Sequence, residues 1–182
     1  MKKNIALLAG GYSGEYEISI KTAITIANHL DPNLYQVYKI IVTKESWMYT
    51  TEDDKAIMID KNDFSLLINN EKIKFDAVFI AIHGTPGEDG KIQGYLDMLA
   101  IPYTTCSAIV SAVTFNKSYC NKVVKALDKV AIANSVHLIK GNRFSVGTIL
   151  EQLKLPVFVK PNECGSSIGI SKVKTVEQLL PA

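Results

Sequence analysis

Two patterns of apolar residues, one typical of strands and one typical of helices, alternate along the first hundred residues of the chain. Unbroken apolar runs occupy residues 4–9, 37–42 and 75–82, a pattern typical of strands buried on both faces. Between the first two runs, apolar side chains recur at helical spacing from residue 17 until Asp31-Pro32 ends the pattern. Residues 47–70 are polar and irregular, which predicts short strands and turns.

A second helix is predicted to follow the third strand and to run through Leu99, with Asp89 as its N-cap. Strands that alternate with helices indicate a doubly wound, Rossmann-like, largely parallel sheet. Ligands bind such sheets at the carboxyl ends of the strands, where the glycine-containing segments 10–14 and 83–90 both fall.

The second half of the chain has a different pattern. Residues 107–128 predict two helices that meet near Asn116-Lys117. A strand over 136–139, a helix over 145–153 and a strand, loop and strand up to residue 173 are expected to follow. We therefore expect two domains, 1–115 and 116–182.

Composition excludes several classes of protein. The 182 residues are 47% hydrophobic and 21% charged, as in an ordinary globular protein, and the formal charge of +2 argues against a nucleic-acid or membrane partner. Three separated cysteines, with no zinc-type spacing, indicate reduced thiols in a cytoplasmic protein. The basic N-terminus resembles a signal peptide, but its apolar run is too short, and no stretch reaches transmembrane length.

The stretch FVKPNECGSSIGISK carries the first candidate site. Lys160 ends an apolar strand, and a loop with Gly165, Ser166, Ser167 and Gly169 follows. Backbone amides in such a loop can converge on an anion, and a lysine at its rim can reach bound phosphates. An ordinary hairpin turn is the alternative.

The stretch AGGYSGE allows two interpretations. It nearly matches a dinucleotide fingerprint, but Ala9 replaces the first glycine, and the only acidic residue at the required distance, Asp31, lies at a helix end. In the second interpretation, the Glu15 carboxylate binds a substrate ammonium. A carboxylate that only stabilises a helix start is the commoner case.

His83 directly follows a predicted buried strand, in the stretch IHGTPGEDGKIQG, which lacks the pattern of a P-loop. A lone histidine is usually structural, and we assign His29 and His137 that way. The glycines and acidic residues around His83 favour a functional position instead. Lys117 stands at the predicted helix junction, and most lysines are simply solvated.

Three stretches, LLAGGYSGEYEIS, IAIHGTPGEDGKIQGYLDMLAIPYT and LPVFVKPNECGSSIGISKV, together resemble the D-alanine–D-alanine ligases of the ATP-grasp superfamily. The resemblance implies an N-terminal α/β domain and then the first part of an α+β ATP-grasp domain. It also implies a cytoplasmic, homodimeric enzyme that ligates two D-alanines for peptidoglycan, with ATP and Mg²⁺ or Mn²⁺.

The resemblance also implies roles for individual residues. Glu15 would bind the ammonium of the first D-alanine, His83 would lie near its carboxylate, and Ser166 would hydrogen-bond in the substrate site. The residues expected at the ATP phosphates are Lys117, Lys160, Gly165, Ser166, Ser167 and Gly169. Such a site must offset the negative charges gathered around an acyl phosphate and exclude water from it.

Two departures from the family pattern accompany the resemblance. Thr105-Cys106-Ser107 stands where the family has a Gly-Ser-Gly-like turn. Family members also continue beyond the equivalent of Ala182, with the adenine site and the metal ligands, so we expect this chain alone to show no turnover. The remaining alternatives are a D-alanine–D-lactate ligase, a non-catalytic nucleotide-binding fragment and a dinucleotide-dependent oxidoreductase.

Overall fold

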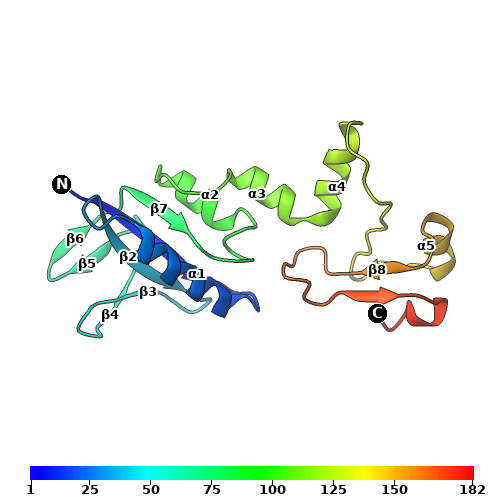
Figure 1. Cartoon of the computed structure of the whole chain (residues 1–182), viewed down its shortest axis with the longest axis horizontal. Coiled ribbons are helices and arrows are strands. Elements are labelled where there is room, and N and C mark those ends of the chain that lie inside the picture. Colours follow the sequence, from blue (N-terminus) through cyan, green and yellow to red (C-terminus); the bar gives the residue numbers. More distant parts are fainter. The chain divides into compact units, whose positions relative to one another are not determined.

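The computed structural model describes residues 1–182, and the chain divides into two compact units, Met1–Ala112 (unit 1) and Val113–Ala182 (unit 2). Figure 1 shows the elements of unit 1, most of which it labels. They are β1 (Lys3–Gly10), α1 (Tyr16–His29), β2 (Tyr35–Val42), β3 (Trp47–Thr50), β4 (Ala56–Met58), β5 (Leu66–Ile68), β6 (Glu71–Ile73), β7 (Ala77–Ile80) and α2 (Lys91–Met98). Helix α3 (Ala108–Phe115) spans the division between the units.

A five-stranded sheet with the order β4-β3-β2-β1-β7 forms the centre of unit 1. The three strands β2, β1 and β7 are parallel to one another, while β3 and β4 extend the sheet as antiparallel strands. The predicted α/β class with a parallel sheet is therefore confirmed. Only β2, β1 and β7 are parallel, because the irregular segment after β2 folds back as short antiparallel strands.

Strand β1 is buried on both faces, and this accounts for its unbroken apolar run. Ala6 and Leu8 join the core on the side of α2, whereas Leu7 and Ala9 pack with Ala23 of α1. The two helices thus cover opposite faces of the sheet, as a doubly wound arrangement requires.

An aromatic cluster closes the α2 side of this core. Tyr95 of α2 packs edge-on against Trp47, with ring centroids 5.5 Å apart, and against Phe64 at 6.0 Å. The Tyr95 hydroxyl donates a hydrogen bond to the Lys61 carbonyl at 2.8 Å. Burial, followed by the negative charges of Asp63 and Asp60, raises the pKa of Tyr95 to about 12.

Unit 2 consists of short elements. They are α4 (Lys117–Ala126), α5 (Val146–Gln152), β8 (Val157–Val159), β9 (Ser171–Val173) and the 3-10 turn η1 (Val176–Gln178). Strands β8 and β9 pair as an antiparallel ribbon, and the predicted strand, loop and strand is confirmed. The chain's only buried apolar residues outside unit 1 are Ile149 and Val173.

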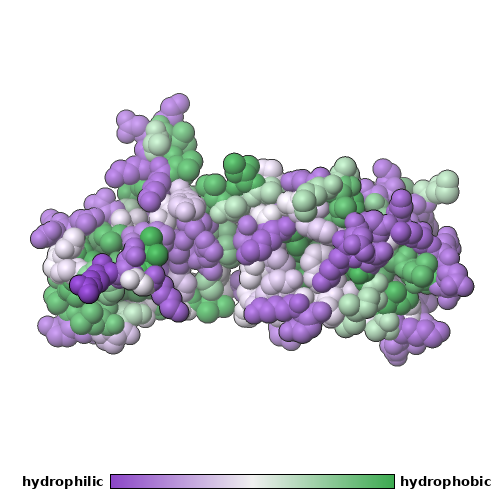
Figure 2. All heavy atoms as spheres, turned by 180° about the vertical axis from the view of Figure 1, so that it is seen from behind, coloured by the Kyte–Doolittle hydropathy of each residue, from purple (hydrophilic) through white to green (hydrophobic).

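Apolar side chains also reach the surface of the molecule, as the space-filling view of one face shows (Figure 2). On α4 they stand four residues apart, at Tyr119, Val123 and Leu127, each at least half exposed. No helix of the chain combines the length and the hydropathy that crossing a bilayer demands.

Two local predictions are wrong. Residues 136–139 form no strand, because β8 pairs only with β9 and no partner offers a hydrogen-bonding edge to this segment. The N-cap of α2 is Gly90, with a left-handed φ of 84°, rather than Asp89. Asp89 acts one position earlier, where its carboxylate accepts a hydrogen bond from the Lys91 amide at 3.3 Å.

Candidate functional site

Two loops of unit 1 meet at the carboxyl edge of the parallel strands. One follows β1 and the other follows β7, and these strands are neighbours in the sheet. The Tyr12 amide donates to the Thr85 carbonyl at 2.9 Å, and the Ser13 hydroxyl donates to the His83 carbonyl at 3.0 Å. The two glycine-containing segments singled out in the sequence therefore form one surface.

Glu15 lies in this surface and is only 5% exposed. It occupies the N-cap position of α1, yet its side chain makes no capping hydrogen bond to the helix. A Cβ atom added to Gly84 would lie 3.2 Å from Glu15 Oε2 and only 2.7 Å from the Ser13 hydroxyl, so the Gly84 backbone closely approaches this carboxylate. Gly84 also has a φ of 72°, which favours glycine, and directly follows His83. The structure thus brings Glu15 and the His83 loop together.

The His83 ring is held from α1. Its Nε2 atom lies 3.1 Å from the Thr22 hydroxyl, which also donates to the Ile18 carbonyl at 3.0 Å. A hydroxyl has one proton, so the Thr22 oxygen accepts from Nε2–H when it donates to Ile18. This leaves Nδ1 of the neutral ring as an acceptor. His29 shows the opposite arrangement, with Nδ1 2.8 Å from the Thr25 carbonyl.

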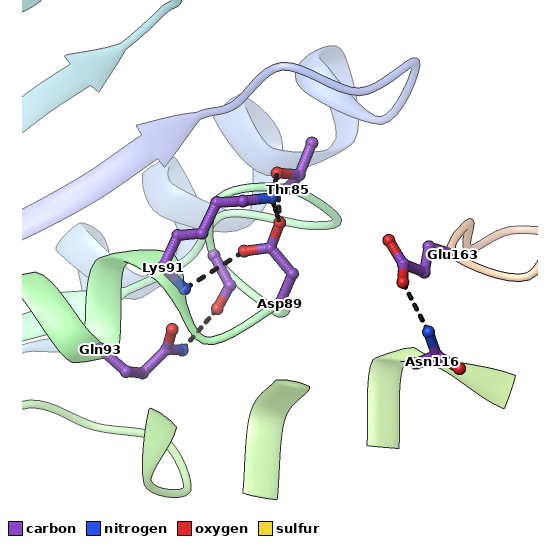
Figure 3. Close-up of polar contacts among 7 residues, drawn as sticks. Thr85, Asp89, Lys91, Gln93, Asn116 and Glu163 are labelled. Carbon is purple, nitrogen blue, oxygen red and sulfur yellow. Dashed lines mark hydrogen bonds and ion pairs between the residues drawn. The ribbon is translucent and has the colours of Figure 1, made fainter. Parts of the chain in front are cut away.

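Hydrogen bonds brace the segment from His83 to the start of α2. The Glu88 carboxylate accepts from the Gly84 amide at 2.8 Å, and the Gln93 amide group donates to the Gly87 carbonyl at 2.6 Å. Asp89 binds both the Thr85 hydroxyl and the Lys91 ammonium, as Figure 3 shows for these side chains. The glycines and acidic residues of this segment therefore build a fixed loop.

The second candidate group lies in unit 2, on both sides of the β8–β9 loop. Lys160 directly follows β8 and is exposed. The Lys117 ammonium, at the first residue of α4, donates to the Cys164 carbonyl at 2.6 Å and to the Asn162 carbonyl at 3.4 Å. An ammonium has three donors, so one remains for a bound anion.

The loop between these lysines has an uncommon backbone. Ser166, Ser167 and Gly169 have φ values of 47°, 58° and 71°, and the two serines are not residues that favour this region. Successive left-handed residues change the direction in which backbone N–H groups point, and such turns form anion-binding concavities. Each strained serine costs on the order of 1 kcal/mol.

A cavity of about 940 Å³ lies within unit 2. Lys117 and Lys160 both line it, as do Ser118 and Asn121 of α4 and apolar residues of α5 and β8. Cavities of this size accommodate cofactor-sized ligands. A lining that combines apolar residues with Lys117, Lys154 and Lys160 suits a molecule with an apolar part and an anionic part.

The structure thus groups the predicted residues by unit. Glu15 and His83 lie together in unit 1, while Lys117, Lys160 and the 165–169 loop lie together in unit 2. No group of three or more His, Cys, Asp or Glu side chains converges as a metal site. The dinucleotide alternative is weakened, because Asp31 caps a local turn through the Asn33 amide at 2.8 Å.

Sequence analysis missed three supporting residues. They are Ser13, which bridges the two loops of unit 1, Thr22, which holds His83, and Asn162, which binds the N-terminus of α4. Ser13 and Asn162 were visible as polar residues inside the quoted motifs. Thr22 gave no signal, because a threonine inside a helix is ordinarily explained by its own i−4 carbonyl.

Comparison with known proteins gives two matches to family models. The model described as D-ala D-ala ligase N-terminus matches residues 4–106, and the model described as D-ala D-ala ligase C-terminus matches residues 128–182. Together they cover both units.

Individual relatives agree with the family models. A D-alanine–D-alanine ligase of Parabacteroides distasonis is 47% identical over 182 residues, which are 100% of this chain and 55% of that protein. The crystal structure of D-alanyl-alanine synthetase A from Vibrio cholerae has a TM-score of 0.82 and 34% identity, and the match covers 99% of this chain and 54% of that one.

A D-alanine–D-alanine ligase of Bacillus anthracis, solved in complex with ATP, matches with a TM-score of 0.73 and 26% identity, over 98% of this chain and 53% of that one. The chain thus spans about half the length of the relatives that it matches.

Proposed function

Because the chain belongs to the D-alanine–D-alanine ligase family, we propose that the whole protein ligates two D-alanines at the expense of ATP. In this reaction, the carboxylate of the first D-alanine attacks the γ-phosphorus of ATP, and ADP leaves. The amine of the second D-alanine then attacks the acyl phosphate, and inorganic phosphate leaves as the peptide bond forms. The product would serve peptidoglycan synthesis.

Unit 1 would bind the first amino acid. The Glu15 carboxylate is only 5% exposed and lies beside the His83 loop, where it could form a charge-assisted hydrogen bond with a substrate ammonium. His83, held by Thr22 through its Nε2 atom, would lie near the carboxylate of this amino acid. The braced loop that carries His83 would keep both groups in place during phosphoryl transfer.

Unit 2 would bind the phosphates of ATP. The observation that carries this proposal is the loop with left-handed Ser166, Ser167 and Gly169, set beside Lys117 and Lys160 on the rim of a cofactor-sized cavity. Fixed amides and lysines offset the charge that develops as the phosphoryl group moves. The Ser166 hydroxyl would also reach the substrate.

The cation that phosphoryl transfer needs is not assigned to this chain. Mg²⁺ or Mn²⁺ prefers several oxygen ligands, and no cluster of three carboxylate or imidazole side chains is present to supply them. We therefore derive no step from a metal ion held by these residues. The domain boundary at 115/116, a homodimer and a cytoplasmic location remain part of the proposal.

Two paired substitutions in the whole protein test the proposal. Glu15→Gln should weaken binding of the first D-alanine by about 1.5–3 kcal/mol, through loss of a charge-assisted hydrogen bond, and leave the KM for ATP unchanged. Lys160→Ala should do the reverse and impair ATP use by about 10²–10³-fold. The measurement is D-alanine-dependent phosphate release, with each substrate varied in turn.

Lys140→Ala, which removes an exposed lysine of unit 2 that does not line the cavity, is the control for Lys160→Ala. If Glu15→Gln leaves both D-alanine constants at the wild-type values, Glu15 has no place in the site. Wild-type ATP kinetics in Lys160→Ala would mean that Lys160 is a solvated surface lysine with no role in ATP binding. Replacing the second D-alanine with D-lactate in the same assay tests the alternative ligase activity.

A further inference from the structure

The segment that leads into the phosphate loop is bonded to the N-terminus of α4. Asn162, Glu163 and Cys164 lie at least 44 residues beyond Ser118 in sequence, yet each of them binds this helix end. We call this set of contacts the loop anchor. Lys117 is the only member that the proposed function already uses.

Asn116 is central to the loop anchor and is only 8% exposed. Its Oδ1 atom accepts a hydrogen bond from the Tyr119 amide at 3.0 Å, and this makes it the N-cap of α4. Its Nδ2 atom donates to Glu163 Oε1 at 2.6 Å, as Figure 3 shows. Because the cap requires an acceptor, the donor end of the amide necessarily faces Glu163.

Asn162 satisfies two further amides of the helix end. Its Oδ1 atom accepts from the Ser118 amide at 2.9 Å, and its carbonyl oxygen accepts from the Lys117 amide at 3.2 Å. The first amides of a helix have no partner within the helix, so they can bind a distant segment without breaking the helix. The loop anchor thus uses the N-terminus of α4 as its fixed base.

The strained part of the loop begins directly after the loop anchor. Cys164 is followed by Gly165 and then by the left-handed Ser166 and Ser167. A loop that is ordered before its ligand arrives loses less conformational entropy on binding. The strain must be supported by surrounding contacts, and those that precede it are the contacts of Asn116 and Asn162.

We propose that Asn116, Asn162 and Glu163 are positioning residues, which hold the phosphate loop in its binding conformation and so determine the affinity for ATP. This inference rests on the proposed function of the loop, but the existence of the loop anchor can be tested without ATP. The polarity of the Asn116–Glu163 hydrogen bond makes the test specific.

Asn116→Asp is the variant that breaks this hydrogen bond. Aspartate keeps the acceptor for the Tyr119 amide and is itself a good N-cap, so α4 should keep its stability. It places one carboxylate against another where a donor had met an acceptor. Glu163→Gln in the same chain should restore the contact with its polarity reversed, because the glutamine amide can donate to Asp at position 116.

Two measurements use these variants. Amide hydrogen exchange of the 182-residue chain without nucleotide reports the order of residues 164–169. Steady-state kinetics of the whole protein reports KM for ATP, KM for D-alanine and kcat. Asn142→Asp adds the same charge at an exposed residue of unit 2 that does not line the cavity, and serves as the control.

We expect Asn116→Asp to speed exchange at residues 164–169 and to raise the KM for ATP about tenfold, the effect of about 1.4 kcal/mol. The KM for D-alanine should stay near wild type. The double variant Asn116→Asp, Glu163→Gln should recover both properties, Glu163→Gln alone should have a smaller effect than Asn116→Asp, and Asn142→Asp should have none.

Unchanged exchange and unchanged ATP kinetics in Asn116→Asp would overturn the proposal. Failure of the double variant to recover would remove the Asn116–Glu163 bond from the loop anchor. If the wild-type protein shows no ATP-dependent activity, the proposed function fails, and the ATP role of the loop anchor fails with it. Altered exchange would then still show that the anchor orders the loop.

Discussion

Different interactions stabilise the interior of unit 1 and the interior of unit 2. Unit 1 has a sheet with an apolar core on each face, and its site residues lie on braced loops at one edge of that sheet. In unit 2 only Ile149 and Val173 are buried apolar residues, and the contacts that precede its loop are hydrogen bonds between the N-terminus of α4 and the segment 162–164.

This difference affects how each unit would bind its ligand. Burial of apolar area is the main source of folding stability, so unit 1 can hold a buried carboxylate such as Glu15 in a fixed position. A single hydrogen bond contributes only about 0.5–1.5 kcal/mol, so the order of the loop in unit 2 depends on a few polar contacts. Three predictions test this contrast, from the largest expected effect to the smallest.

Removal of a core side chain should destabilise unit 1 most. Leu8 of β1 is fully buried, and Leu8→Ala should lower the free energy of unfolding by about 2–5 kcal/mol. Trp47, the chain's single tryptophan, lies in the same core, so its fluorescence during urea unfolding reports on unit 1. Leu67→Ala, at a leucine that is 60% exposed, is the matched control.

Val173→Ala extends this comparison to unit 2. Val173 is as well buried as the core of unit 1, but its truncation should leave the Trp47 transition where it is. A shift of that transition comparable with that of Leu8→Ala would mean that the two units unfold as one. A Leu8→Ala effect below about 1 kcal/mol would contradict the account of the unit 1 core.

An intermediate effect is expected from Thr22→Val, which removes the hydroxyl that holds His83. The substitution removes the bond to Ile18 as well as the bond to His83, and loss of the His83 bond should cost unit 1 about 0.5–1.5 kcal/mol beyond the effect of losing the helix bond alone. The ring ¹⁵N shifts of His83 should also move, because Nε2–H loses its acceptor. Thr25→Val removes a similar hydroxyl bond in α1, to the Lys21 carbonyl at 3.2 Å, without a histidine, and should leave these shifts unchanged.

A role of Thr22 in helix stability alone would give the two threonine variants the same unfolding free energy and the same His83 shifts. Thr22→Ser keeps the hydroxyl and should retain the wild-type shifts. Its failure to do so would show that the methyl group, and not the hydrogen bond, orients the ring.

The effect that is smallest near neutral pH comes from Tyr95, whose titration acts only at alkaline pH. The pKa of Tyr95, raised to about 12 by burial and then by Asp63 and Asp60, exceeds the ordinary value of 10.0. Between these values the unfolded chain loses the Tyr95 proton while the folded chain keeps it. The contribution of Tyr95 to the free energy of unfolding is therefore fully present below about pH 10 and falls as the pH rises toward 12.

Tyr95→Phe should reduce this alkaline loss of stability in the Trp47 unfolding transition. Tyr119→Phe, at an exposed tyrosine of unit 2, is the control and should keep the wild-type pH dependence. Equal alkaline loss in Tyr95→Phe and the wild type would assign the effect to other groups.

The strands and helices of unit 1 were predictable from sequence, whereas hydrogen bonds between distant residues were not. The buried run of β1 and the helical spacing of α1 are properties of neighbouring residues, so the sequence alone predicted both elements. The expected strand over 136–139 failed, because strand formation depends on a partner that no local pattern reveals. The pairing of Asn116 with Glu163 joins residues 47 positions apart, and neither residue is distinctive alone.

The residues of the candidate site also fall into two groups, those that the sequence revealed and those that only the structure revealed. Lys160 and the 165–169 loop stand out locally, as a lysine before glycines and serines, and Glu15 and His83 stand out because each follows a strand. Ser13 and Thr22 became visible only when the structure placed them against His83. The roles of the predicted residues in catalysis and ATP binding remain predictions.

The central claim is that unit 1 binds the amino acid and unit 2 binds the phosphates of ATP. An NMR titration of the 182-residue chain, with D-alanine and ATP added separately, tests it most directly. The account predicts that D-alanine shifts amide signals at residues 13–15 and 83–88, and that ATP shifts those at Lys117 and at residues 160–169. ATP-induced shifts confined to residues 9–14, with none in the 160–169 loop, would contradict it.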